Sequence, residues 1–163
     1  GYFISRPSNS NYDSMASGGT NLAQTNPKLI ENIDNRRDKI FARFKDNNIP
    51  IDLLTTSSSG LDPHISKNSA IFQIKTIAKE RNLDIKSIEK IVEKYIEKRY
   101  LGIIGEERVN VLLLNIALDK ESRDNLKRLF ASTYSKKNEV IDLEDIKTIR
   151  IKINLSLNEF IKK

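Results

Sequence analysis

The sequence predicts a mixed fold of the α/β or α+β class, a single domain with one sheet flanked by about four helices. Three observations support this prediction. Apolar residues recur at helical spacing in several segments, they alternate with polar residues in another, and no internal repeat is visible. The chain of 163 residues is long enough to bury a core without disulfides, and it contains no cysteine.

The first 26 residues are polar and rich in turn-forming types, so we expect an ordered loop or an extended arm there. Asn26 and Pro27 then indicate the start of a helix. Asn accepts a hydrogen bond at the N-cap, and Pro fits the first helical position, where its missing donor is not needed. The apolar spacing predicts that this helix covers residues 27–46.

The middle of the chain predicts both strands and helices. Residues 51–54 are expected to form a short strand. Ser66 and Asp84 are candidate N-caps, each followed by isoleucines at helical spacing. Residues 109–118 are almost continuously apolar and follow a glycine-punctuated turn, which favours a buried strand over a helix.

The end of the chain has a different pattern. Residues 121–132 predict one more amphipathic helix, and strict alternation from Ile149 to Leu157 predicts a half-buried strand. Disordered segments rarely keep such patterns. An exposed alternating strand can also pair with another chain, which leaves the oligomeric state open.

The charge pattern does not favour a nucleic-acid partner. The chain carries 28 Lys and Arg against 22 Asp and Glu, for a net charge of +6, but the excess is spread thinly along its length. Proteins that grip phosphate backbones usually concentrate their basic residues on one face or arm. No stretch reaches the roughly 18 apolar residues of a spanning helix.

Sequence motifs for catalysis and phosphate binding are missing. There is no GxxxxGK[ST] loop, and no GxGxxG follows a strand. The Ser17-Gly18-Gly19 run can form an anion-binding nest, although such runs are more often simple turns. With one histidine and no cysteine, we expect no metal cofactor.

His64 lies two residues after Asp62 and close to the serines at positions 57–59. Composition leaves a Ser/His/Asp triad open, but the spacing of a nucleophile elbow is absent. A rigid turn in which Asp62 accepts backbone donors is the preferred interpretation. The adjacent Glu106 and Glu107 have the composition of an acid/base pair, yet neighbours in a turn usually both face water.

A family resemblance comes from loop motifs that stand in one order along the chain. These motifs are Arg6-Pro7-Ser8, Ala16-Ser-Gly-Gly-Thr-Asn-Leu22, Thr25-Asn-Pro27, Ser59-Gly-Leu-Asp-Pro-His-Ile-Ser66, Leu101-Gly102, Gly105-Glu106, Arg108-Val-Asn-Val-Leu112 and Leu114-Asn115. Together they resemble the KdpC family, the C subunit of the Kdp high-affinity potassium-transporting ATPase. Glu107 stands where the family usually has proline. We therefore expect residues 1–118 to form a KdpC-like soluble domain, with residues 119–163 as an extension packed on it.

The resemblance implies a non-catalytic accessory subunit. In the family, a P-type subunit hydrolyses ATP and a channel-like subunit carries potassium, and both are the expected partners of this chain. Family members begin with one membrane-spanning helix. Its absence here indicates a truncated domain of a cell-membrane protein, and we expect that domain on the outer face.

Two interpretations of the family's role compete. In the first, the C subunit is a catalytic chaperone that raises the ATP affinity of the hydrolysing subunit, and Ser17, Gly18, Gly19 and Gln73 are candidate nucleotide contacts. In the second, the domain stabilises the channel-like subunit from the outer face. A free-standing nucleotide-binding or hydrolytic protein is the alternative from another class.

The residue patterns favour structural roles for most of these candidates. Gln73 is expected at the edge of an apolar helical stripe, bonding a nearby loop carbonyl rather than a base. Any ATP binding is expected to be weak, with a dissociation constant no tighter than about 0.1 mM. The remaining motif residues are expected to be structural or docking residues: Asp62, His64, Arg108, Asn110 and Asn115.

Overall fold

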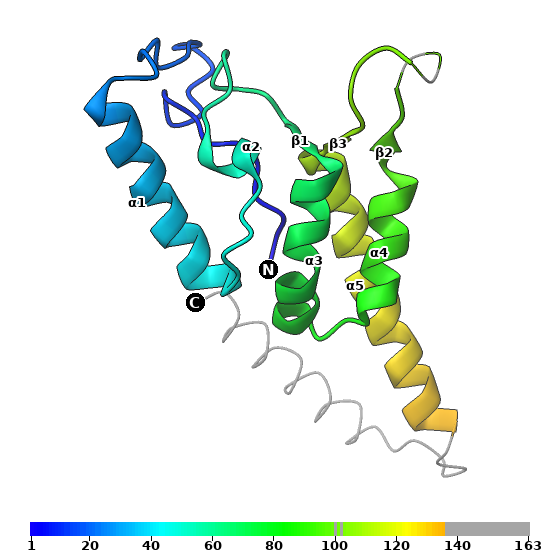
Figure 1. Ribbon diagram of the computed structural model, residues 1–163. Helices are drawn as coiled ribbons and strands as arrows, with labels where there is room; N and C mark the ends of the chain where they lie inside the picture. The colour runs from blue at the N-terminus through cyan, green and yellow to red at the C-terminus, as the bar shows by residue number, and fades with distance from the viewer. Residues whose placement is uncertain (100, 102, 136–163) are drawn as a thin grey trace. The chain divides into compact units, whose positions relative to one another are not determined.

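The computed structural model describes residues 1–99, 101 and 103–135. In that part of the chain the fold is mixed as predicted, with five helices and one three-stranded antiparallel sheet (Figure 1). The chain divides into two compact units, residues 1–125 and 126–163, and the core described below belongs to the first. The strand expected at 149–157 lies outside the described residues.

Helix α1 (Pro27–Phe44) begins where the sequence predicts. The Asn26 side chain accepts a hydrogen bond from the Lys28 N–H at 3.0 Å, and proline occupies the first helical position. The helix ends at Lys45, which adopts a left-handed conformation and donates its N–H to the Phe41 carbonyl. Local capping chemistry therefore sets both ends of this helix.

Residues 51–54 form a one-turn helix, α2 (Ile51–Leu54), so the strand expected there is wrong. Pro50 precedes the turn, and both the N–H and the hydroxyl of Thr55 donate to the Ile51 carbonyl at 3.0 Å. The turn buries Leu53 and Leu54 on the core. Four residues are too few for periodicity to distinguish a helical turn from a strand.

Helices α3 (Lys67–Arg81) and α4 (Ile85–Lys94) start at the predicted caps and pack against each other (Figure 1). The Ser66 side chain accepts from the Ser69 N–H, and the Asp84 side chain accepts from the Ser87 N–H. Between the two helices, Asn82 takes the left-handed conformation that commonly closes a helix.

The sheet consists of β1 (His64–Ser66), β2 (Ile96–Glu97) and β3 (Arg108–Asn110) in the order β1-β3-β2. Val109 pairs with Ile65 on one side and with Ile96 on the other. Because side chains alternate along a strand, these three apolar residues share the face that packs on the core. The opposite side, which we call the polar sheet face, carries His64, Ser66, Glu97, Arg108 and Asn110.

The buried strand expected over residues 109–118 is also wrong, since β3 ends at Asn110 and α5 (Val111–Ser135) follows directly. The Asn110 side-chain oxygen accepts the N–H groups of Leu112 and Leu113, as a helix N-cap does. The helix expected at 121–132 is therefore part of this longer helix.

The first turns of α5 are apolar on more than one side. Val111, Leu114 and Leu118 are buried, whereas Leu112 and Ile116 are exposed. A helix with apolar residues on both sides lacks the 3.6-residue period that identifies amphipathic helices, which explains the error in the prediction.

The core gathers buried side chains from the N-terminal segment, the helices and the sheet. Its buried members are Phe3, Ile40, Phe44, Leu53, Leu54, Ile65, Ala70, Ile74, Ile77, Ala78, Ile88, Val92, Val109, Val111, Leu114 and Leu118. Within the described residues, no helix combines the length and the apolar character needed to span a bilayer.

Candidate functional site

The candidate residues lie at three places in the first unit. Ser17, Gly18 and Gly19 meet the loop at residues 57–60. A second group occupies the polar sheet face and the turn that leads into β1. Gln73 and Asn115 contact the N-terminal segment. The contacts of Gln73 and of the Ser17–Gly19 run are therefore made with different parts of the chain.

At the first place, two loops bond to each other. The Gly18 N–H donates to the Ser59 carbonyl at 2.8 Å, and the Ser17 hydroxyl donates to the same carbonyl at 3.0 Å. Gly60 has a φ of +72°, and a Cβ there would approach the Gly18 carbonyl oxygen to 3.1 Å. The Gly18 N–H, which an anion-binding nest would need as a donor, is thus already bonded to Ser59. The geometry therefore favours a structural turn.

At the second place, a cavity of about 550 Å³ lies beside the polar sheet face. Asp62 forms the expected turn, since its Oδ1 accepts the His64 N–H at 3.0 Å and lies 3.1 Å from His64 Nδ1. His64 Nε2 faces Glu97 Oε1 at 3.5 Å. Both ring nitrogens therefore face carboxylates, and the Ser/His/Asp triad that composition left open is not assembled.

Several of the charged side chains that line the cavity form ion pairs. Arg108 Nε donates to Glu97 Oε2 at 2.8 Å, and this bond holds the pKa of Glu97 below its ordinary value. Lys67 Nζ lies 3.2 Å from Glu107 Oε2. Glu107 is thus part of an ion pair rather than of an acid/base pair with Glu106. In the described part of the chain, no three acidic or histidine side chains gather closely enough to hold a metal ion.

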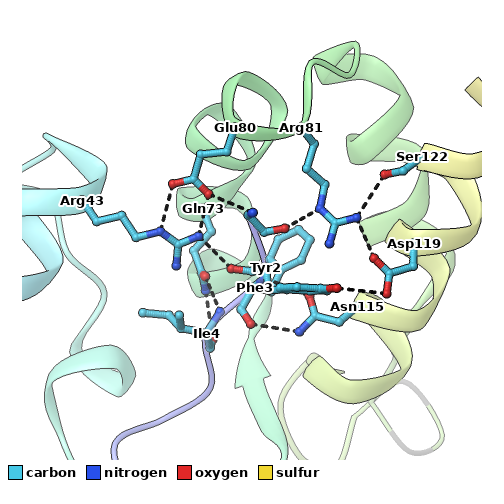
Figure 2. A network of polar contacts seen from close by, with 11 residues as sticks. Tyr2, Phe3, Ile4, Arg43, Gln73, Glu80, Arg81, Asn115, Asp119 and Ser122 are labelled. Carbon is cyan, nitrogen blue, oxygen red and sulfur yellow. Dashed lines mark hydrogen bonds and ion pairs between the residues drawn. The ribbon is translucent and has the colours of Figure 1, made fainter. Parts of the chain in front are cut away.

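At the third place, Gln73 is fully buried instead of lying at the edge of an apolar stripe. Its Oε1 accepts the Ile4 N–H at 2.7 Å, and its Nε2 donates to the Ile4 carbonyl at 3.2 Å (Figure 2). Its Nε2 also donates to the Ser69 carbonyl at 3.1 Å. The N-terminal segment covers this side of α3. The spacing of apolar residues in α3 does not indicate that another segment packs over Gln73.

Asn115 makes a matching contact from α5. Its Oδ1 accepts the Phe3 N–H at 2.9 Å, and its Nδ2 donates to the Phe3 carbonyl at 3.0 Å (Figure 2). Two carboxamides from different helices thus bond two successive residues of one extended segment.

Sequence reasoning missed the charged residues around this segment. Arg43 donates to the Tyr2 carbonyl at 3.0 Å and to Glu80 at 2.8 Å, and its hydrogen bond lowers the pKa of Glu80. Arg81 donates to the Gly1 carbonyl, pairs with Asp119 at 2.7 Å and lies over the Tyr2 ring at 4.3 Å. Basic residues are ordinary near helix C-termini, so no local signal singled out either arginine.

The fold and these contacts define a small mixed α/β domain in which most candidate polar groups bond the chain's own backbone. Residues 1–120 match the family described as KdpC, the c chain of the K⁺-transporting ATPase. The chain therefore belongs to the KdpC family.

Several curated relatives carry the name potassium-transporting ATPase KdpC subunit. The relative from Caldanaerobacter subterraneus is 43% identical over 129 residues, which cover 77% of this chain and 67% of the relative. The Shewanella putrefaciens relative is 47% identical over 121 residues, covering 73% and 61%. The Allorhizobium ampelinum relative is also 47% identical over 121 residues, covering 72% and 63%. The chain thus spans about three fifths to two thirds of their length.

Proposed function

We propose that this chain is a non-catalytic accessory subunit of an ATP-driven, high-affinity potassium uptake complex. It acts by docking to the ATP-hydrolysing and potassium-channel-like subunits of that complex. The observation that carries the proposal is the family match over residues 1–120. That range contains the three strands and all the buried core residues of the described structure.

Two surface features support docking. On α5, the side chains of Leu112, Leu113 and Ile116 are exposed, although the same helix packs its other side in the core. Exposed apolar side chains that lie together mark protein–protein contact surfaces. The polar sheet face adds charged groups, such as Glu97 and Arg108, whose pairing can be exchanged for pairing with a partner.

The catalytic-chaperone role, on this proposal, works through protein contacts with the hydrolysing subunit. Two observations support this. The carboxamide of Gln73 is fully buried and already bonds Ile4 and Ser69, and the Gly18 N–H already bonds Ser59. A nucleotide would have to break these bonds before it gained its own. We therefore expect the isolated chain to bind ATP no more tightly than about 0.1 mM, or ~5.5 kcal/mol.

The experiment that tests the proposal is reconstitution of the transport complex with and without this subunit. We expect potassium-stimulated ATP hydrolysis to require the subunit, and the isolated chain to show no turnover approaching ~1 s⁻¹. Turnover near that rate by the isolated chain would favour a free-standing hydrolytic protein instead. A complex that assembles and works equally well without the subunit would contradict the accessory role.

We further propose that the domain lies on the outer face of the cell membrane. The chain has no cysteine, so a cysteine introduced at the exposed Asn68 is the only thiol of the described sequence. In intact cells that express the protein, a membrane-impermeant maleimide is expected to label Asn68→Cys. Labelling that occurs only after lysis would place the domain on the inner face.

A further inference from the structure

The N-terminal segment is held by side chains instead of by a neighbouring strand. All four carbonyls of residues 1–4 accept hydrogen bonds from side chains, and the N–H groups of Phe3 and Ile4 donate to side chains. In a sheet, the next strand satisfies such groups. The residues that do so here are Arg43, Gln73, Arg81 and Asn115, and we call them, with residues 1–4, the N-terminal clamp (Figure 2).

The side chains of the segment indicate a single register. Phe3 is 3% exposed in the core, whereas Tyr2 is 46% exposed and lies beneath the Arg81 guanidinium. Neighbouring side chains of an extended segment point to opposite sides, so a slip by one residue would remove Phe3 from the core. A slip that placed Tyr2 in the core instead would also bury its hydroxyl group, at a cost unless a new partner were found.

Carboxamides suit this task for a chemical reason. A Gln or Asn side chain carries a donor and an acceptor together, so it can bond the N–H and the carbonyl of one residue as a strand does. It is also neutral, so its burial does not require a compensating charge. Gln73 does this for Ile4 and Asn115 does it for Phe3.

We propose that α3 and α5 form a binding site for an extended peptide segment, occupied in the same chain by residues 1–4, in which Gln73 and Asn115 are positioning residues that fix the register. The ligand class is an extended backbone with an aromatic side chain facing the core. Any polypeptide joined ahead of Gly1 then leaves the domain in a fixed direction. This inference concerns the domain itself and does not depend on the proposed transport role.

Amide hydrogen exchange, followed by NMR on the full chain, tests the proposal. Gln73→Met removes the hydrogen bonds but keeps a side chain of similar length, and Asn115→Leu removes them but keeps the branched shape of the side chain. We expect the Ile4 N–H to exchange about tenfold faster in Gln73→Met, and the Phe3 N–H about tenfold faster in Asn115→Leu, each relative to the Val92 N–H in α4. Asn68→Leu, at an exposed position of α3, is the matched control and is expected to change neither ratio.

Unchanged ratios in both variants would overturn the proposal, as would equal acceleration of every amide in residues 1–125. Asn115→Asp gives an independent comparison at a half-buried position. It keeps an acceptor for the Phe3 N–H but replaces the donor to the Phe3 carbonyl with a carboxylate oxygen, so the Phe3 N–H is expected to stay more protected than in Asn115→Leu. Equal loss of protection in Asn115→Asp and Asn115→Leu would also overturn it.

Discussion

The N-terminal clamp and the polar sheet face both hold many polar groups, but they use different chemistry. In the clamp, the neutral carboxamide of the buried Gln73 bonds backbone groups. On the sheet face, Glu97 and Arg108 form an ion pair whose side chains are 44% and 60% exposed. Breaking the first leaves buried groups without partners, whereas water replaces the second at little cost. The clamp is thus expected to hold the fold, and the sheet face remains available to a partner.

The largest expected effect is that of Gln73→Ala. The substitution leaves the N–H and carbonyl of Ile4 without their partner, and it opens a cavity where the buried Gln73 side chain packs. We expect the free energy of unfolding to fall by roughly 3 kcal/mol in urea denaturation. Asn68→Ala, at an exposed position of the same helix, is expected to change it by less than about 0.5 kcal/mol. A loss below about 1 kcal/mol for Gln73→Ala would remove the distinction between the two regions.

Asp52→Ala tests a residue that combines both kinds of environment. Asp52 lines the cavity, but its carboxylate accepts the Ser66 N–H at 2.8 Å and the hydroxyl of the fully buried Ser69. We expect a loss of about 2 kcal/mol, because the Ser69 hydroxyl is left without an acceptor. Thermal unfolding beside the exposed-site variant Asp38→Ala measures this. If Asp52→Ala were as stable as Asp38→Ala, the hydrogen bond to the buried Ser69 would contribute nothing measurable, and Asp52 would behave like an exposed residue of the cavity wall.

Glu97→Gln tests the polar sheet face itself. The ion pair with Arg108 is exposed and at the surface, so we expect the substitution to reduce stability by less than about 1 kcal/mol. The small effect is expected to shrink further at about 1 M salt, where exposed charges are screened. A loss as large as that of Gln73→Ala, insensitive to salt, would mean that the sheet face is as essential to the fold as the clamp.

Acid titration tests the ion pair between Glu80 and Arg43 of the clamp, where the smallest effect is expected. The hydrogen bond from Arg43 lowers the pKa of Glu80 in the folded state. Glu80 therefore stabilises the fold above its unfolded-state pKa, and this stabilisation is lost as the pH falls through the lowered value. Glu80→Gln is expected to show a weaker loss of stability on acidification than the parent chain, with the exposed Glu89→Gln as control. Identical pH dependence in all three would contradict this.

Local chemistry explains which parts of the fold were predictable. Asn26, Ser66 and Asp84 each cap a helix through a side-chain contact within three residues, so the sequence alone indicates those helix starts. At residues 111–118, the first turns of α5 are apolar on two sides, so the apolar residues do not show the 3.6-residue spacing that identifies an amphipathic helix. Asn110, as the cap of α5, was the available signal for that helix.

The candidate site was less predictable because its decisive contacts join distant parts of the chain. The family motifs drew attention to Asp62 and His64, which the structure brings together with Glu97 on the polar sheet face. The burial of Gln73 depends on Ile4, 69 residues away, and no pattern within α3 reports that partner. The nucleotide contacts expected at Ser17, Gly18, Gly19 and Gln73 stay predictions.

The central claim is that Gln73 serves the chain's own N-terminal segment and not a nucleotide. An NMR titration of the full chain with ATP tests it directly through the side-chain amide of Gln73 and the backbone amides of Phe3 and Ile4. We predict that these signals keep their positions up to millimolar ATP, as does the backbone amide signal of Val92 in α4. Saturable shifts at Gln73 and Ile4 with a dissociation constant tighter than about 0.1 mM, abolished in Gln73→Met, would contradict the account.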